Sequence, residues 1–138
     1  MSGKMIFLNL PVENLERAKE FYEAIGWPIN EDFTDENAAC VVVDDNICLM
    51  LLTKKFYSTF TKRPIADTVA SNGALYALAL ESREAVDALT EAAVKAGGTE
   101  ELNEQKREQE AEAGMHGRAF QDLDGHQWEP FFMDYTGA

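Results

Sequence analysis

The sequence contains an internal repeat that constrains the fold more than any other feature. Residues 7–22 and 75–90 align at an offset of 68 positions, which pairs Asn14 with Ser82. Each copy has an apolar stretch, then a residue suited to cap a helix, then an amphipathic stretch that ends at glycine. A repeat of this length indicates two copies of one supersecondary unit.

Hydrophobic patterning predicts the same order of elements in each copy: a strand, a helix and three more strands. In the first copy, we expect Asn14 to cap a helix that Gly26 ends. In the second copy, Ser82 and Gly97-Gly98 have these roles. The strands are expected at residues 5–12, 27–33, 38–43, 47–53, 73–80, 99–102, 115–121 and 126–133.

Two turns and one polar segment complete the assignment. Residues 44–46 and Asp124-Gly125 are expected to close hairpins, the second as a two-residue turn. Residues 103–114 carry almost nothing to bury, so we expect a mobile loop or an exposed helical turn there.

These elements predict an α+β fold in a single domain, and 138 residues suffice for its core. We expect two βαβββ units, at about residues 4–58 and 73–135, with a connector at residues 54–72. A helix would cover one face of each sheet. The uncovered faces would form the interior of a cup-shaped mixed sheet.

Composition excludes several classes of partner. The net charge of −13 argues against nucleic acid and anionic membranes as partners, because phosphate contacts need Lys and Arg. It is compatible with a cationic small molecule, although a solvated acidic surface is the simpler explanation. Cys40 and Cys48 are the only cysteines, and we expect buried, inert thiols on neighbouring strands. No membrane span or signal peptide is seen, which favours the cytoplasm.

Two segments carry a resemblance to a known superfamily. Residues 10–15, with Phe21-Tyr22 ahead of Gly26-Trp27, and the closing residues 120–129 resemble the vicinal oxygen chelate superfamily. Its members include glyoxalase I, extradiol dioxygenases, fosfomycin-resistance enzymes and bleomycin-binding proteins. The closing segment is most similar to a branch described as predicted lactoylglutathione lyases. The resemblance implies a glyoxalase-type fold and a homodimer, and it leaves the activity open.

The resemblance also implies where a metal would be held. Metal-dependent members take His, Gln or Glu ligands from the first and last strands of each unit. The corresponding positions here are Phe7, Met50, Leu75 and Glu129, of which three are apolar. A divalent metal needs three or four N, O or S ligands, so we expect no metal and no other cofactor.

Alternation along the strands predicts which side chains line the cup. The two-residue turn would place Phe120 opposite Glu129 and Arg118 opposite Phe131. His116 would share this face near its rim, and His126 would be exposed. The residues expected to bind a ligand are Phe7, Asn9, Met50, Leu52, Phe56, Leu75, Arg118, Phe120 and Phe131. The aromatic members are also compatible with an ordinary core, and Asn9 with a bond to backbone.

Glu129 and His116 are the candidate catalytic residues. Burial in an apolar cup would raise the pKa of Glu129 toward that of a general base. Alternatively, Arg118 would neutralise it as a cross-strand neighbour. His116 is either an acid/base group or a histidine at the surface edge.

Three functions are therefore considered. The first is a metal-free protein of the glyoxalase/bleomycin-resistance type that binds a small molecule. The second is a lactoylglutathione lyase-like or other lyase or isomerase that uses Glu129 as general base. The third is a partner protein with a cup that is packed shut.

Overall fold

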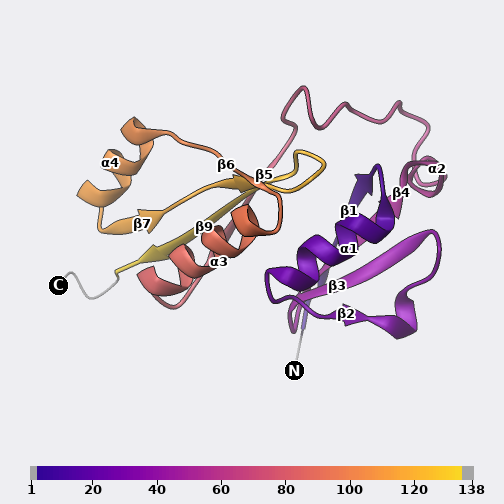
Figure 1. The fold of residues 1–138 in the computed structure, drawn as a ribbon, viewed down its shortest axis with the longest axis horizontal. Helices are drawn as coiled ribbons and strands as arrows, with labels where there is room; N and C mark the ends of the chain where they lie inside the picture. The colour runs from indigo at the N-terminus through magenta and orange to yellow at the C-terminus, as the bar shows by residue number, and fades with distance from the viewer. Residues whose placement is uncertain (1–2, 135–138) are drawn as a thin grey trace. The chain divides into compact units, whose positions relative to one another are not determined.

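The computed structural model describes residues 3–134 and divides into two compact units, the first ending at Asp67 and the second beginning at Thr68. Each unit is a mixed sheet with a long helix against one face (Figure 1). The predicted order of a strand, a helix and three strands is confirmed in both units, with the third strand of the second unit broken in two.

The first unit has the strand order β1-β4-β3-β2, with β1 parallel to β4 and the other pairs antiparallel. Its elements are β1 (Ile6–Val12), α1 (Leu15–Ala24), β2 (Ile29–Asn30), the 3-10 helix η1 (Glu31–Phe33), β3 (Ala38–Asp44), β4 (Ile47–Thr53) and α2 (Lys54–Tyr57). The strand expected at residues 27–33 is thus cut short, because Asn30 caps η1 by accepting a bond from the Asp32 amide at 3.1 Å.

Local chemistry explains why α1 forms where the sequence predicts it. The Asn14 side chain accepts a hydrogen bond from the Arg17 amide at 3.1 Å. Gly26 leaves the helix with φ of 101°, a left-handed value that glycine adopts easily. The buried face of the helix consists of Leu15, Ala18, Phe21 and Tyr22. This face packs on β3 and β4, where Val41, Leu49 and Leu51 are fully buried.

The second unit has the strand order β5-β9-β8-β6, and β7 also pairs with β9. Its elements are β5 (Leu75–Ala79), α3 (Arg83–Lys95), β6 (Thr99–Glu100), α4 (Glu104–Glu112), β7 (Met115–Gly117), β8 (Phe120–Gln121) and β9 (Gln127–Met133). Ser82 caps α3 as predicted, accepting a bond from the Ala85 amide at 3.0 Å. The polar segment forms the helix α4, which is longer than the loop or single turn expected and has no buried residue.

The last hairpin corrects the predicted turn. The Asp122 amide bonds the His126 carbonyl at 2.9 Å, so residues 123–125 form a three-residue turn. The Asp122 carboxylate accepts bonds from the amides of Asp124 and His126, each at 2.9 Å, and Gly125 has φ of 84°. The register is therefore shifted by one residue, and Phe120 lies opposite Trp128 instead of Glu129.

A shift of one residue moves side chains to the opposite face of a sheet. His116 lies opposite Phe132, and the Arg118 amide bonds the Pro130 carbonyl at 3.1 Å. His116, Arg118 and Phe120 therefore face α3 and not the open face, contrary to the prediction. Phe120 has no exposed surface, and His126 is buried rather than exposed.

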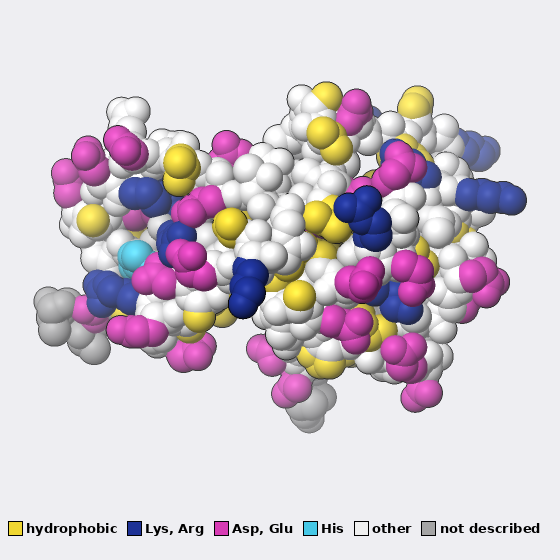
Figure 2. Space-filling model, viewed as in Figure 1, with side chains coloured by type: hydrophobic (Ala, Val, Ile, Leu, Met, Phe, Trp, Pro, Cys, Tyr) yellow, Lys and Arg dark blue, Asp and Glu magenta, His cyan; other side chains and the backbone are white. Residues whose placement is uncertain are grey.

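No described helix has the length and apolar character that a membrane span requires. Acidic side chains are scattered over both units on the face that Figure 2 shows. This distribution agrees with the net charge of −13.

Candidate functional site

The first unit leaves one face of its sheet without a helix across its centre. Phe7 on β1 lies beside Cys48 on β4, and Asn9 lies beside Met50. Phe7 is 52% exposed, Asn9 is exposed and Met50 is half-buried. These three predicted ligand residues therefore share one accessible and largely apolar face.

The other end of this face is closed by α2. Leu52 has the same orientation as Met50 but is only 1% exposed. α2 contacts β1 and β4, and its Phe56 ring meets Phe60 edge-on, with ring centroids 5.1 Å apart. Leu52 is thus a core residue, and Phe56 belongs to an aromatic pair next to that core.

The second unit has the corresponding open face. Leu75 lies beside Gln127, Ala77 beside Glu129 and Ala79 beside Phe131 in the parallel β5–β9 pairing. Leu75 is 52% exposed, whereas Glu129 and Phe131 are half-buried. Leu75, Glu129 and Phe131 are thus brought together as predicted.

Glu129 has no partner within the described residues 3–134. Its carboxylate makes no hydrogen bond or ion pair there, and its neighbour Ala77 is exposed. Arg118, the predicted neutralising partner, lies on the other face because of the register shift. Glu129 is therefore an unpaired carboxylate on a largely apolar surface.

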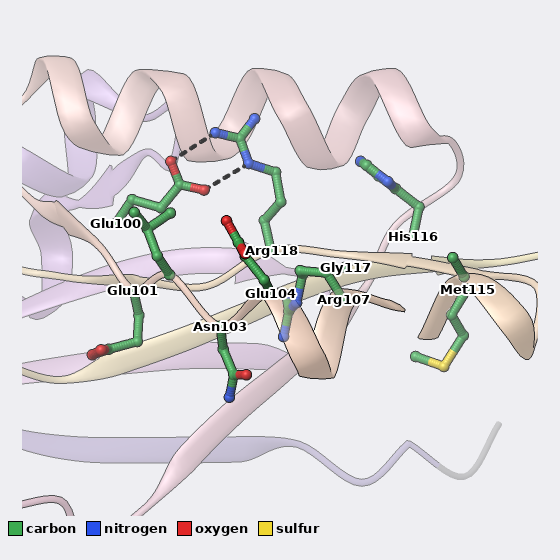
Figure 3. Close-up of a pocket in the computed structure, with 11 residues that line it drawn as sticks. Glu100, Glu101, Asn103, Glu104, Arg107, Met115, His116, Gly117 and Arg118 are labelled. Carbon is green, nitrogen blue, oxygen red and sulfur yellow. Dashed lines mark hydrogen bonds and ion pairs between the residues drawn. The ribbon is translucent and has the colours of Figure 1, made fainter. Parts of the chain in front are cut away.

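Arg118 instead joins the sheet to α3. Its guanidinium donates two bonds to Glu100, at 3.0 and 2.9 Å (Figure 3). It also donates one bond to Asp87 at 3.1 Å and pairs with Glu91 at 2.9 Å. The bonds to Glu100 are the main reason that the pKa of Arg118 is raised above its ordinary value. With three carboxylate partners, Arg118 is a structural cation.

His116 takes part in the same cluster. Its Nε2 lies 2.8 Å from Oδ1 of Asp87. This bond, together with those from Arg118, lowers the pKa of Asp87 below its ordinary value. His116 and Glu129 therefore lie on opposite faces of the sheet and do not form an acid/base pair.

A cavity of about 290 Å³ lies between the β6–α4 segment and β7. Its lining includes His116 and Arg118, and also Asn103, Glu104 and Arg107, which were not among the predicted site residues (Figure 3). Asn103 caps α4 by accepting a bond from the Lys106 amide at 3.1 Å. An Asn followed by a run of strong helix formers was the available signal for this helix.

The residues present do not fit a divalent metal. The four positions at which a metal ligand would be expected are Phe7, Met50, Leu75 and Glu129. They lie on open sheet faces, but only Glu129 offers an oxygen ligand. Within residues 3–134, no three His, Cys, Asp or Glu side chains gather into a group that could hold a metal. One carboxylate does not provide the ligand set that such an ion needs.

Comparison with known family models finds a match in the first unit. Residues 4–44, which include β1, α1, β2 and β3, match the family model described as bleomycin resistance protein-like N-terminal. No curated protein sequence matches the chain significantly.

Solved structures match almost the whole chain. A hypothetical protein from S. aureus has 25% identity and a TM-score of 0.71, with 96% of this chain and 95% of that chain covered. A glyoxalase/bleomycin resistance protein/dioxygenase family enzyme from Burkholderia phytofirmans PsJN has 14% identity and a TM-score of 0.74, with 96% of this chain and 100% of that chain covered. A fosfomycin resistance protein from Mesorhizobium loti has 14% identity and a TM-score of 0.64, with 99% of this chain and 96% of that chain covered. The chain has the glyoxalase-type fold.

Proposed function

We propose that the chain is a small-molecule-binding protein of the glyoxalase/bleomycin-resistance type. It would need no divalent metal at Phe7, Met50, Leu75 and Glu129, the positions that hold the metal in metal-dependent members. Its ligand would carry a cationic group on an apolar body. The observation that carries this proposal is the unpaired Glu129 carboxylate, which lies beside Ala77 and near Leu75 and Phe131 on the open face.

The physical reason is complementarity. A half-buried carboxylate without a partner has lost part of its hydration and gains most from a ligand that brings a positive charge. Leu75 and Phe131 offer apolar contact to the rest of such a ligand. The net charge of −13 would raise the local concentration of cations and disfavour anions.

Three compounds with one apolar body test the proposal: 4-phenylbutylamine, 4-phenylbutanol and 4-phenylbutyrate. We expect calorimetric titration to give the affinity order amine, alcohol, carboxylate, with about a tenfold preference for the amine over the alcohol, since a charged hydrogen bond contributes about 1.5–3 kcal/mol. Glu129→Gln should remove this preference. Glu20→Gln, which makes the same charge change on an exposed position of α1, should retain it.

Two results would contradict the proposal. One is that none of the three compounds binds the folded protein at millimolar concentration. The other is an equal preference for the amine in the wild type and in Glu129→Gln, which would place the cation elsewhere.

A second candidate is a lactoylglutathione lyase-like or other lyase or isomerase with Glu129 as general base. The same unpaired carboxylate favours it, because a general base must be free to accept a proton. His116 would take no part, since Asp87 holds it on the opposite face. This candidate predicts turnover that Glu129→Gln abolishes and Glu20→Gln preserves, and a lack of turnover with a panel of 2-oxoaldehydes and glutathione would count against it.

We also propose a homodimer. β1 and β5 are edge strands, and the apolar side chains of Ile6, Phe7 and Leu75 are each 52% exposed. Exposed apolar patches and free strand edges favour association with a second copy. Sedimentation equilibrium should give twice the chain mass of 15.4 kDa, and a monomer at micromolar concentration would contradict this assignment.

A further inference from the structure

Three sulfur-containing side chains share the open face of the first unit: Cys40, Cys48 and Met50. Cys40 lies directly opposite Met50 in the antiparallel β3–β4 pairing. Cys48 lies two positions before Met50 on β4, so alternation directs both side chains to the same face. The three sulfurs therefore belong to neighbouring positions of one surface.

The two thiols are in contact and largely shielded from water. Cys40 is 2% exposed and Cys48 is 6% exposed, and neither forms a disulfide. Burial, the nearby Cys48 and a hydrogen bond between the two thiols raise the pKa of Cys40. The protonated form of the Cys40 thiol is therefore favoured, and a bound cation would have to replace that proton. Met50 is half-buried, so this part of the group is accessible to solvent.

The neighbouring positions contain a single hard ligand, the amide oxygen of Asn9. Phe7 lies beside Cys48 and Val42 lies opposite it, while Asn9 lies beside Met50. None of these neighbours is a carboxylate or an imidazole, which usually complete a Zn²⁺ site that has only two cysteines, and Mg²⁺ and Ca²⁺ are held by oxygen ligands.

We propose that Cys40, Cys48 and Met50 form a binding site for a soft monovalent cation, of which Cu(I) is the biological example. Thiolate and thioether ligands select such an ion by their softness. On binding, the two thiols release their protons to solvent, and the ion is held by two thiolates and one thioether. No electron is transferred. The proposal is independent of the ligand site at Glu129, which lies in the other unit.

The test is an anaerobic titration of the reduced full chain with Cu(I) in the presence of a competing chromophoric chelator. We expect the wild type to retain one equivalent and to release protons as it does so. Cys48→Ala and Met50→Leu should each weaken retention by at least about tenfold, since even the loss of a group outside the ligand set commonly costs that much. Met5→Leu removes a 52% exposed methionine outside the group and should bind as the wild type does.

Thermal unfolding of each variant shows whether a loss of Cu(I) retention reflects a lost ligand or a protein that no longer folds. Met50→Leu nearly conserves volume and should fold even if Cys48→Ala does not. Three outcomes would overturn the proposal: a folded wild type that retains no Cu(I), retention by Met50→Leu equal to that of the wild type, or retention of Zn²⁺ as strong as that of Cu(I). Ag(I), followed by native mass spectrometry, gives an independent count of bound ions without redox chemistry.

Discussion

Arg118 and Glu129 lie on opposite faces of the second sheet, although the Arg118 amide bonds the carbonyl of Pro130, the residue next to Glu129. Arg118 points toward α3 and pairs with Asp87, Glu91 and Glu100. Glu129 points to the open face and has no partner among residues 3–134. This separation makes Arg118 structural and leaves Glu129 available to a ligand.

Arg118→Met should lower the free energy of unfolding by about 2–3 kcal/mol, because it leaves three carboxylates close together without their cation. The Arg118 side chain is only 19% exposed, so water replaces the lost bonds poorly. Urea unfolding followed by circular dichroism measures the change. Arg17→Met, on an exposed position of α1, should cost less than about 0.5 kcal/mol. Equal losses in the two variants would show that the Arg118 cluster contributes nothing specific.

Asp87→Asn should make stability less dependent on pH in acid. The bond with His116 is the largest cause that lowers the pKa of Asp87 below its ordinary 3.8 in the folded chain. A depressed pKa stabilises the folded state above the ordinary value, and this contribution disappears as the pH falls through the folded value. At pH 7 the wild type should therefore have a slightly larger free energy of unfolding than Asp87→Asn. The difference should be small because the Asp87 side chain is 48% exposed, and it should vanish near pH 2.

Urea unfolding of both proteins at several pH values provides the measurement. Asp45→Asn removes an exposed carboxylate from the turn between β3 and β4 and serves as the control. A stability difference between the wild type and Asp87→Asn that stays constant from pH 7 to pH 2 would contradict the role given to the His116 bond.

Asp122→Ala should destabilise the last hairpin by about 2 kcal/mol, since it leaves the buried amides of Asp124 and His126 without their acceptor. Asp122→Asn keeps an acceptor and should lose less. Asp35 accepts two amide bonds in a similar way, from Asn37 and Ala38, but it is exposed, so Asp35→Ala should cost clearly less. Hydrogen exchange of the β8 and β9 amides would localise the effect, and equal costs for Asp35→Ala and Asp122→Ala would rule out burial as its cause.

The sequence predicts local features well because their causes are local. Asn14 and Ser82 cap helices through amides three residues away, and the repeat fixes the order of the elements. The predicted register of the last hairpin was wrong because the sequence Asp-Leu-Asp-Gly allows either a two-residue or a three-residue turn. The choice depends on the Asp122 side chain, which captures two backbone amides.

Long-range relationships in the second unit were harder to predict. The partners of Arg118 come from α3 and β6 and meet it only once the register is known. The full length of helix α4 was not predicted, beyond an exposed helical turn as one alternative, because it has no apolar face, which is the feature that patterning detects. The residues at the four family positions were placed on open faces correctly, since each first strand pairs with the last strand of its own unit.

Three glycine substitutions separate backbone conformation from close contact. Gly73→Ala meets no atom and needs no left-handed φ, so its effect should lie within about 0.5 kcal/mol. Gly26→Ala also meets no atom, but its φ of 101° should cost about 1–2 kcal/mol. Gly125→Ala combines a φ of 84° with a clash against the backbone carbonyl of Thr68, which is not free to move, because the Thr68 hydroxyl donates to the Asp124 carbonyl at 2.6 Å. It should cost about 3 kcal/mol or more. Thermal unfolding of the three variants gives the order directly, and a Gly125→Ala protein no less stable than Gly26→Ala would show that residue 68 does not pack against this turn.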